Sequence, residues 1–389
     1  MNNLQTQIGE LERIETESDL KKSTFEKTSK PRILMIGMHL TKTRGGISTL
    51  INEMLQSSVT ENFEINYIAS QAEDFGRFGK LMLALRAVFS FVFNVLRNNP
   101  ALVYVHLGSN ASLYRESLFI ILAKVFGKKI VGHFHAGDVE EYLVSQSRIG
   151  RRFIASAMSL SDALIAVSQE SAGKLRKIAS RNKISVVANA LNTKAFPFSP
   201  RRFAEREGAN IKLLFVGAMG KLKGEIDLAN AVKILRVNHS NLKITFLGFG
   251  GEKLKNYCEK IGIVDAVEFI GAVSLEKRIE FFEKADIFVL PTYAEAMPMS
   301  VIEAMAAALP CVTTDVGGIP ELIDDGENGF LIEPSNVKKL AERISFLIEN
   351  PQTRIEFAAK AQDKVRRNFG LDDYAVKLTT LLYETIENK

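Results

Sequence analysis

Two glutamates near residue 300 have the spacing of a ligand site. Glu295 and Glu303 are separated by seven residues in the segment PTYAEAMPMSVIEAMAAALP. An apolar run ends at Pro291 and a helix is predicted to begin near Met299, so Glu295 falls in the loop and Glu303 a turn or two along the helix. Backbone N–H groups at a helix start bind anions such as phosphate. Carboxylates beside such a site suit a ligand with sugar or ribose hydroxyls. From the spacing alone, surface glutamates are an equally good interpretation.

A glycine-containing loop follows the first strong apolar run in each half of the chain. Lys221 and Lys223 lie in the loop GAMGKLKG, a position where phosphates commonly bind. Gly45 and Gly46 occupy the corresponding loop of the other half. Glycine there lets the backbone approach a ligand closely. Taken alone, the lysines are also consistent with solvated loop residues, and the glycines with a plain turn.

Three histidines lie near the ends of two neighbouring predicted strands. His106 ends one strand, and His133 and His135 end the next, where positions two apart face the same side. A zinc site needs a third or fourth ligand, usually a carboxylate or a thiol. Because Asp138 is the only such candidate nearby, the sequence predicts no bound metal. A hydrogen-bonding histidine at the mouth of a cleft is favoured.

The elements that must position these residues alternate regularly along the chain. Strand-length apolar runs alternate with helical patterns from Pro31, and the alternation restarts after a proline-containing, charged segment at 196–210. The corresponding first strands begin at residues 33 and 213, an offset of about one α/β domain. Such alternation predicts parallel sheets covered by helices on both faces. We therefore expect an α/β protein with two Rossmann-like, doubly wound domains facing a central cleft, with ligands at the carboxyl ends of the strands.

The composition excludes several classes of protein. The chain of 389 residues is 46% hydrophobic and 24% charged, which argues against a disordered, collagen-like or membrane-embedded protein. A net charge of +5 is too small to indicate nucleic-acid binding, but it is compatible with anionic substrates or an anionic membrane surface. Cys258 and Cys311 give neither a disulfide framework nor a zinc spacing. With no apolar signal-peptide core at the N-terminus, a cytoplasmic location is expected.

The most apolar window of the chain is LMLALRAVFSFVFNVL. It is shorter than the roughly 20 residues that span a bilayer, and Arg86, Ser90 and Asn94 form a narrow polar stripe on it. The favoured prediction is a helix buried against a sheet. The alternative is a helix that dips into a membrane interface, assisted by Arg77, Lys80 and Arg86, which would place the protein peripherally on the inner face of a membrane.

The C-terminal half contains a signature that resembles the donor site of family 4 glycosyltransferases of the GT-B fold. In EAMPMSVIEAMAAALPCVTTDVGGIPELIDDGENGFLI, the E-x7-E pair, the A-M-A-A helix, the DVGGIPE turn and the DG-x-NG turn occur in the family's order. The GG loop, the K-x-K-G loop at 221–224 and the N-A-L-N turn at 189–192 fall at family positions. The resemblance covers residues 31–385. HLGSNASLYRE and HFHAGD are similar to members that build bacterial surface polysaccharides.

The resemblance implies a role for each matching residue. Glu303 would hold the ribose hydroxyls of a nucleotide, and Glu295 the donor sugar near its reacting carbon. Lys223 would neutralise the leaving diphosphate, and His135 would contact the sugar from the N-terminal domain. The remaining binding positions would be Gly45 and Gly46 and the amides of Met297, Met299 and Ser300. The family retains the anomeric configuration and needs no metal.

These implications define the expected function. We expect a retaining hexosyltransferase that uses a nucleoside-diphosphate sugar, with a uridine nucleotide favoured, as co-substrate and needs no cofactor. The acceptor would be a hydroxyl of a lipid-linked or polymeric saccharide in surface polysaccharide synthesis, and no nucleic-acid partner is expected. The alternatives are a non-catalytic GT-B subunit that binds a nucleotide or a partner protein, and a nucleotide-sugar epimerase on the same fold.

The chain departs from the family pattern at several positions. Ala218 stands where members carry an arginine that clamps the diphosphate, and Ala296 and Ala308 stand where glycine is common. Loss of the arginine removes a charge-assisted bond to the leaving group, which can exceed 1 kcal/mol. Three nearby cations are candidates to replace it: Lys42, Arg44 and Lys221.

The expected domain organisation has four parts. Residues 1–30 form an extension with a short helix or no regular structure, and residues 31–197 form an N-terminal acceptor domain. Residues 211–370 form the C-terminal donor domain. By the GT-B resemblance, a last helix within 371–389 packs back on the N-terminal domain.

Overall fold

The computed structural model describes most of the chain. The described residues are 30–43, 45–72, 75–108, 111–180, 182–200, 211–220 and 222–388. Apart from residue 30, the expected N-terminal extension lies outside them, as do two of the candidate replacement cations, Arg44 and Lys221.

The N-terminal half forms a six-stranded sheet in the order β2-β1-β3-β4-β5-β6. Strand β1, second from one edge, is apolar after Arg32 and buried from Ile33 to Ile36, as expected for a strand covered on both faces. Ile33 pairs with Ile65 on one side and Leu102 on the other, both in parallel register. The strands are β1 (Arg32–Met38), β2 (Glu64–Gln71), β3 (Leu102–Leu107), β4 (Lys129–Phe134), β5 (Ala163–Ala166) and β6 (Lys183–Val186).

Two layers of helices cover this sheet. One core cluster joins the sheet to α4, α5, α6 and α7, while α2 contributes to the core on the opposite side. The helices are α2 (Gly46–Leu55), α3 (Val59–Asn62), α4 (Arg77–Asn98), α5 (Ala111–Val125), α6 (Val139–Ser145), α7 (Arg148–Ser159) and α8 (Gln169–Ile178).

The C-terminal half forms a second six-stranded sheet in the order β12-β11-β10-β7-β8-β9. Its strands are β7 (Lys212–Val216), β8 (Lys243–Leu247), β9 (Val267–Ile270), β10 (Ile287–Leu290), β11 (Cys311–Thr314) and β12 (Gly329–Ile332). The helices are α9 (Glu225–Leu235), α10 (Gly251–Ile261), α11 (Leu275–Lys284), α12 (Met299–Ala306), α13 (Ile319–Leu322), α14 (Val337–Glu349) and α15 (Pro351–Asn368).

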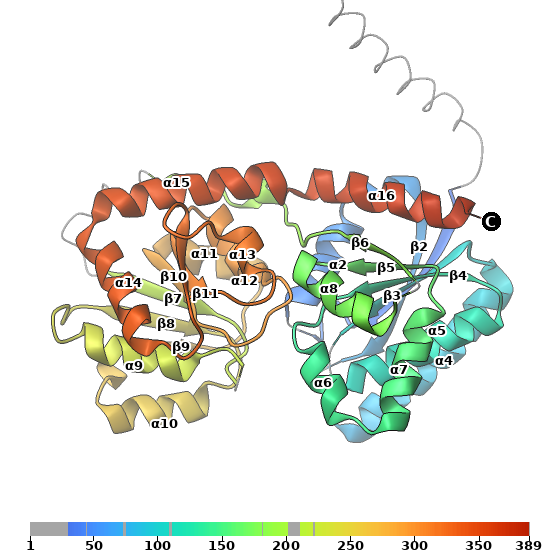
Figure 1. The fold of residues 1–389 in the computed structure, drawn as a ribbon, viewed down its shortest axis with the longest axis horizontal. Helices are drawn as coiled ribbons and strands as arrows, with labels where there is room; N and C mark the ends of the chain where they lie inside the picture. Colours follow the sequence, from blue (N-terminus) through green and yellow to red (C-terminus); the bar gives the residue numbers. More distant parts are fainter. Residues whose placement is uncertain are drawn as a thin grey trace, which may run out of the picture.

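The described strand pairings are parallel in both sheets. The predicted α/β class with two doubly wound domains is therefore confirmed (Figure 1). The order of strands along the chain reverses between β1 and β3 in one sheet and between β7 and β10 in the other. Ligands of such sheets bind outside the strand ends at these switch points.

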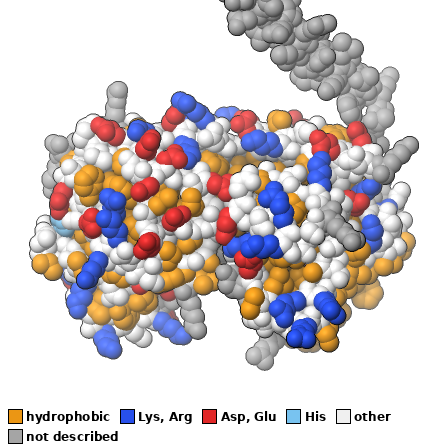
Figure 2. Space-filling model, viewed as in Figure 1, with side chains coloured by type: hydrophobic (Ala, Val, Ile, Leu, Met, Phe, Trp, Pro, Cys, Tyr) orange, Lys and Arg blue, Asp and Glu red, His pale blue; other side chains and the backbone are white. Residues whose placement is uncertain are grey.

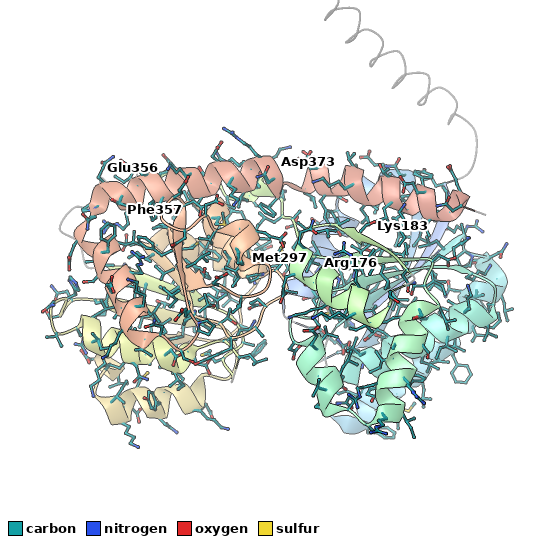
Figure 3. The ribbon with its side chains drawn as sticks, in the orientation of Figure 1. Arg176, Lys183, Met297, Glu356, Phe357 and Asp373 are labelled. Carbon is teal, nitrogen blue, oxygen red and sulfur yellow. The ribbon has the colours of Figure 1, made fainter. Side chains whose placement is uncertain are left out.

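The last helix links the two domains. Helix α15 runs along the C-terminal domain, and α16 (Leu371–Glu387) continues along the N-terminal domain (Figure 1). There α16 packs against α2, α3 and β4, with the Tyr383 ring 4.7 Å from that of Phe63. The Glu384 carboxylate of α16 pairs with Nζ of Lys183, which is labelled in Figure 3, at 2.6 Å.

Helix α4 corrects two expectations. The apolar window was expected to be too short to span a bilayer. Within α4, however, the segment Phe78–Asn98 is 21 residues long with a mean hydropathy of 1.6, which is long and apolar enough to cross a membrane by length and composition. The helix was also expected to be buried, but only 17% of its most apolar stretch is buried. Ala87, Phe91 and Val95 reach the core. The apolar pattern of the sequence did not reveal which side of the helix the sheet covers.

Candidate active site

A cavity of about 1020 Å³ lies between the two domains, at the switch points of both sheets. It is lined by the loop after β1, the loop after β7, the loop from β10 into α12, and the start of α11. All nine residues predicted as the site line this cavity: Gly45, Gly46, His135, Lys223, Glu295, Met297, Met299, Ser300 and Glu303. Their proposed roles stay predictions.

The loop that carries Lys223 is fixed against the end of β10. Gly224 has φ +70°, and a Cβ there would lie 1.9 Å from the carbonyl oxygen of Pro291, so only glycine fits. Tyr293 N donates to the Leu222 carbonyl at 2.8 Å, and Thr292 Oγ1 donates to the same oxygen at 2.7 Å. These contacts fix the loop in a position from which the Lys223 ammonium forms an ion pair with Glu295.

The Glu295 loop is supported from behind by the DVGG turn. Gly317 has φ +58°, and a Cβ on it would lie 1.6 Å from the Glu295 carbonyl oxygen. Gly318 N donates to the Ala296 carbonyl at 2.9 Å. The Glu295 side chain is only 14% exposed, so Lys223 and Glu295 form a largely enclosed pair of opposite charges on the cavity wall.

Helix α12 presents its N-terminus to the cavity. Pro298 is the N-cap residue, and the first amides of a helix have no partner within the helix itself. Met297, at the junction of the two domains in Figure 3, accepts a 2.7 Å hydrogen bond from Asn189 Nδ2 through its carbonyl. Such a terminus carries a partial positive charge and suits an anion.

Glu303 lies deeper along α12 and is 1% exposed. Its carboxylate meets Arg278 Nη2 of α11 at 2.8 Å. Burial raises the pKa of Glu303 to about 7, which Arg278 opposes and Glu53 reinforces. Near neutral pH this carboxyl can therefore accept or donate a hydrogen bond, which suits the paired hydroxyls of a ribose.

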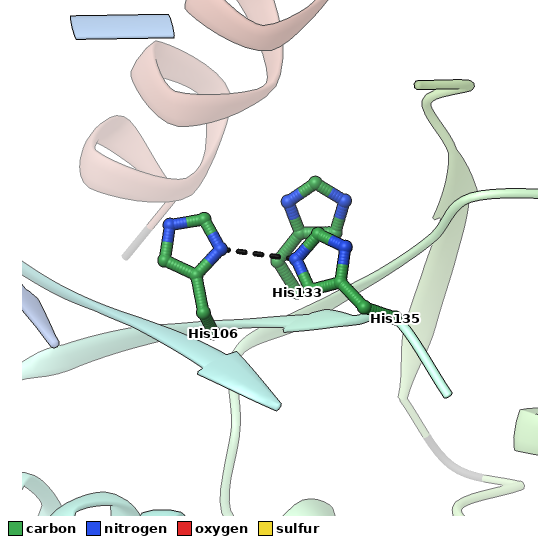
Figure 4. A group of neighbouring side chains, drawn as sticks. All are labelled: His106, His133 and His135. Carbon is green, nitrogen blue, oxygen red and sulfur yellow. Dashed lines mark hydrogen bonds between the residues drawn. The ribbon is translucent and has the colours of Figure 1, made fainter. Parts of the chain in front are cut away.

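His135 forms the wall of the cavity on the N-terminal side. Its Nε2 lies 3.0 Å from His106 Nδ1 (Figure 4). His133 Nδ1 lies 2.6 Å from the Tyr104 hydroxyl. Burial lowers the pKa of His135 to about 3 and that of the other two well below the usual value. These rings are therefore neutral at pH 7 and pack as a hydrogen-bonded stack.

The same three histidines are the one group in the described part of the chain whose side chains could converge on a metal ion, with ligand atoms within 4.8 Å of one another. The candidate Asp138 does not belong to the group. The group contains no carboxylate, and His106 Nδ1 and His133 Nδ1 face His135 Nε2 and the Tyr104 hydroxyl. His106 Nε2 and His133 Nε2 are buried without a hydrogen-bond partner among the described residues. The absence of a bound metal stays a prediction.

The two domains meet around the cavity. A Cβ on Gly137 would lie 2.5 Å from the Glu295 carbonyl carbon, so the backbones of the two domains touch there. Gln169 N donates to the Glu321 carboxylate at 2.7 Å across the same gap. A Cβ on Gly46 would lie 3.2 Å from Met299 Cγ. These contacts define a closed arrangement of the domains.

Sequence reasoning missed some of these residues. Arg278 sits in an amphipathic helix where nothing distinguishes it from a surface arginine, and only the fold reveals Glu303 beside it. Of the candidates to replace the family arginine, Lys42 lies 4.5 Å over the Phe75 ring and is not among the residues that line the cavity. Ala218 itself lines the cavity, which leaves that position of the described wall without a cation.

The two halves of the chain match two family models. Residues 46–195 match the model described as Glycosyltransferase Family 4, and residues 199–364 match the one described as Glycosyl transferases group 1. Among curated proteins, a glycogen synthase of Mycobacterium tuberculosis is 29% identical over 189 residues, which are 48% of this chain and 45% of that protein. The aligned part of the chain spans about half the length of its first curated relatives.

Solved structures share the fold. A sucrose-phosphate synthase from Thermosynechococcus elongatus superposes with a TM-score of 0.79 at 15% identity, covering 91% of this chain and 99% of that one. HepE of Anabaena, solved in complex with UDP-glucose, superposes with a TM-score of 0.73 at 18% identity over the same shares. At these identities the likeness concerns the fold alone. The two family matches confirm the resemblance to glycosyltransferases: the N-terminal half is similar to Glycosyltransferase Family 4 and the C-terminal half to the group 1 glycosyl transferases.

Proposed function

We propose that this protein is a retaining, metal-independent glycosyltransferase that takes a hexose from a UDP-sugar. The observation that carries the proposal is the ion pair of Lys223 and Glu295, which lies on the cavity wall together with the start of α12 and with Glu303 of that helix. A cation, a helix N-terminus and two carboxylates match the diphosphate, sugar and ribose of a nucleotide sugar. The UDP-glucose bound to HepE and the names of the synthases above support the same ligand class.

Each part of the donor has a matching wall. The ribose hydroxyls would meet Glu303, which Arg278 holds in place. The diphosphate would meet Lys223 and the amides of Met299 and Ser300, with Gly45 and Gly46 closing over it from the other domain. The sugar would lie between Glu295 and His135, which face the cavity from opposite domains.

The proposed reaction needs little covalent chemistry from the protein. The bond between the sugar's anomeric carbon and the diphosphate oxygen breaks, and the acceptor oxygen bonds to the same carbon on the same face. The acceptor proton passes to the departing phosphate oxygen, so both electrons and protons balance. Lys223 and the α12 amides stabilise the charge that develops on the diphosphate, and enclosure between the domains orients the reactants.

The acceptor is proposed to be a hydroxyl of a lipid-linked or polymeric saccharide in surface polysaccharide synthesis, in the cytoplasm. This rests on the similarity of the segments HLGSNASLYRE and HFHAGD to members with that role. The second of these segments ends beside the cavity, where His135 is a lining residue.

The test is turnover of a panel of UDP-, GDP- and ADP-sugars, by hydrolysis or by transfer to a saccharide acceptor. We expect release of UDP by the wild type, and a loss of at least 10²-fold in kcat for Lys223→Met and Glu295→Gln, measured on variants that circular dichroism shows to be folded at the assay temperature. Lys233→Met and Glu252→Gln, on exposed helix surfaces, are the matched controls. A wild type that turns over no sugar, or a variant with wild-type kcat, contradicts the proposal.

A non-catalytic nucleotide-binding subunit is the second candidate, and Ala218 favours it. Without the family arginine, the wall near Lys223 has less positive charge for a leaving diphosphate. Calorimetry that shows nucleotide binding without turnover would support this candidate. Activity gained on Ala218→Arg would then identify the missing charge as the cause.

A further inference from the structure

The outer side of α4 carries a stripe of exposed apolar side chains. Phe78 and Phe89 are both 76% exposed. Most exposed apolar residues of the helix follow one another at intervals of three or four residues, so they lie along one side of it. We call this the α4 stripe; its members are Phe78, Leu81, Met82, Leu85, Phe89, Phe93 and Leu96.

The fold does not need this stripe. A different side of α4, with Ala87, Phe91 and Val95, supplies the contacts with the core. The Phe91 ring packs against Phe119 at 5.6 Å and against Phe126 at 6.5 Å, which ties α4 to α5. Helix α4 therefore has one apolar side for the protein and a second that is open to solvent, and continuous exposed patches of this kind mark interaction sites.

A basic helix, α7, lies on the same side of the sheet as the stripe. Helices α4, α5 and α7 share one core cluster, in which α5 packs against both of the others (Figure 1). Helix α7 exposes Arg148, Arg151 and Arg152 together with Ile149, which is 83% exposed. In Figure 2, basic and hydrophobic side chains gather on the lower part of the right-hand lobe, where these helices lie.

The charges that α4 and α7 expose have one sign. Helix α4 exposes Lys80, Arg86 and Arg97, and neither α4 nor α7 contains a single Asp or Glu. An apolar stripe flanked by cations is the pattern of an element that lies in the headgroup region of an anionic bilayer.

We propose that α4 and α7 dock this protein on an anionic lipid surface, with α4 lying in the plane of the interface. A spanning arrangement would pull Ala87, Phe91 and Val95 out of the core and strip β1 and β2 of their cover, so the helix lies on the membrane and does not cross it. A second copy of the chain is the rival occupant, but a two-fold contact would set the same arginines against one another. The proposal is independent of the reaction proposed above.

The test is flotation of the full chain with vesicles of phosphatidylglycerol and phosphatidylcholine mixed, against pure phosphatidylcholine. At low salt we expect the protein to float with the anionic vesicles and to bind neutral ones at least tenfold more weakly, with high salt releasing much of it. Protein that stays at the bottom with anionic vesicles overturns the proposal. So does a dimer in light scattering that Phe89→Ser converts to monomer.

Matched variants distinguish binding through the α4 stripe from non-specific binding of the protein to vesicles. The triple change Phe78→Ser, Phe89→Ser, Phe93→Ser is expected to reduce vesicle binding at least tenfold. Val237→Ser with Val376→Ser, which removes exposed apolar side chains elsewhere, should leave it unchanged. Arg148→Gln, Arg151→Gln and Arg152→Gln together should weaken binding to anionic vesicles, whereas Lys253→Gln, Lys255→Gln and Lys260→Gln on α10 should not. Equal losses in the variant and control sets contradict the assigned surface.

Discussion

The loops that follow the first strand of each domain have equivalent places in the fold and opposite constraints. After β7, Gly224 is held in the left-handed region against the Pro291 carbonyl, and Gly217 of the same loop is packed by Gly248, which follows β8 at φ +142° with no room for a Cβ. After β1, Gly45 is extended at φ −169° and a Cβ there would meet no atom within 4 Å. The C-terminal loop is thus a fixed support for a charged side chain, and the N-terminal loop is an open edge of the cavity.

This difference suggests a division of labour between two similar domains. The C-terminal domain supplies most of the charged groups of the cavity, among them Lys223, Glu295 and the pair Glu303–Arg278. The N-terminal domain supplies glycines, the neutral His135 and Glu53. It also carries the exposed apolar stripe of α4, whereas the apolar residues Leu254 and Cys258 of α10 in the C-terminal domain are buried. Most of the charged cavity groups and the exposed stripe therefore lie in different domains.

Substitution of the two loop glycines by alanine tests the difference between the two loops with the largest expected effect on the free energy of unfolding. Gly224→Ala is expected to destabilise the protein by about 3 kcal/mol or more, because it combines a left-handed backbone with a clash against a carbonyl. Gly45→Ala, at a helix N-cap with open space, should cost about 1 kcal/mol or less. Urea unfolding measures both. Equal effects would show that the two loops are not differently constrained.

Removal of Arg278 should cost nearly as much. Arg278→Met leaves the buried Glu303 carboxylate without its partner, an expected loss of about 3 kcal/mol above pH 8. The pKa of Glu303 is raised to about 7 in the folded protein, whereas in the unfolded chain it is about 4.5. At pH 6 the folded protein therefore carries a protonated, uncharged Glu303. The loss of unfolding free energy caused by Arg278→Met should then be smaller than above pH 8.

Arg236→Met is the matched control for that change. Arg236 pairs with Asp265, whose side chain is 62% exposed, and surface pairs contribute about 1 kcal/mol or less. A similar loss in both variants, without pH dependence, would contradict the role given to Arg278.

The sequence predicted much of this arrangement, for physical reasons. Buried parallel strands such as β1 and β7 are apolar after their first, basic residue. The E-x7-E spacing places Glu295 and Glu303 on the loop and helix that meet the switch point. The partner of Glu303 could not be predicted, because Arg278 comes from a different helix and the contact exists only in the fold. The open side of α4 was missed for a related reason: apolar spacing shows that a side is apolar, not what covers it.

The histidine stack gives the N-terminal domain a pH dependence of its own. The pKa values of His106, His133 and His135 are lowered in the folded protein, so below about pH 6.5 the unfolded chain binds more protons. Stability should fall on acidification by up to about 1.4 kcal/mol per pH unit for each histidine. His133→Gln should flatten this slope in thermal melts from pH 7.5 to 5. An unchanged slope in His133→Gln contradicts the neutral stack.

The smallest expected effect is a gain. Ala308 follows α12 at φ +53°, in a conformation that glycine adopts without strain. Ala308→Gly should stabilise the C-terminal domain by up to about 1 kcal/mol, because relief of the left-handed backbone exceeds the added entropy of the unfolded chain. Thermal melts of Ala308→Gly and of Ala307→Gly, the neighbouring C-cap residue at φ −74°, give the comparison. Destabilisation of equal size in both would contradict a strained backbone at Ala308.

The most direct test of the donor site is a crystal structure with UDP, paired with calorimetry on the wild type and Lys223→Met. The account predicts the diphosphate within hydrogen-bond distance of Lys223 Nζ, the ribose hydroxyls at the Glu303 carboxylate, and an affinity at least tenfold weaker in Lys223→Met. UDP bound away from these two side chains, or with equal affinity for both proteins, would contradict it.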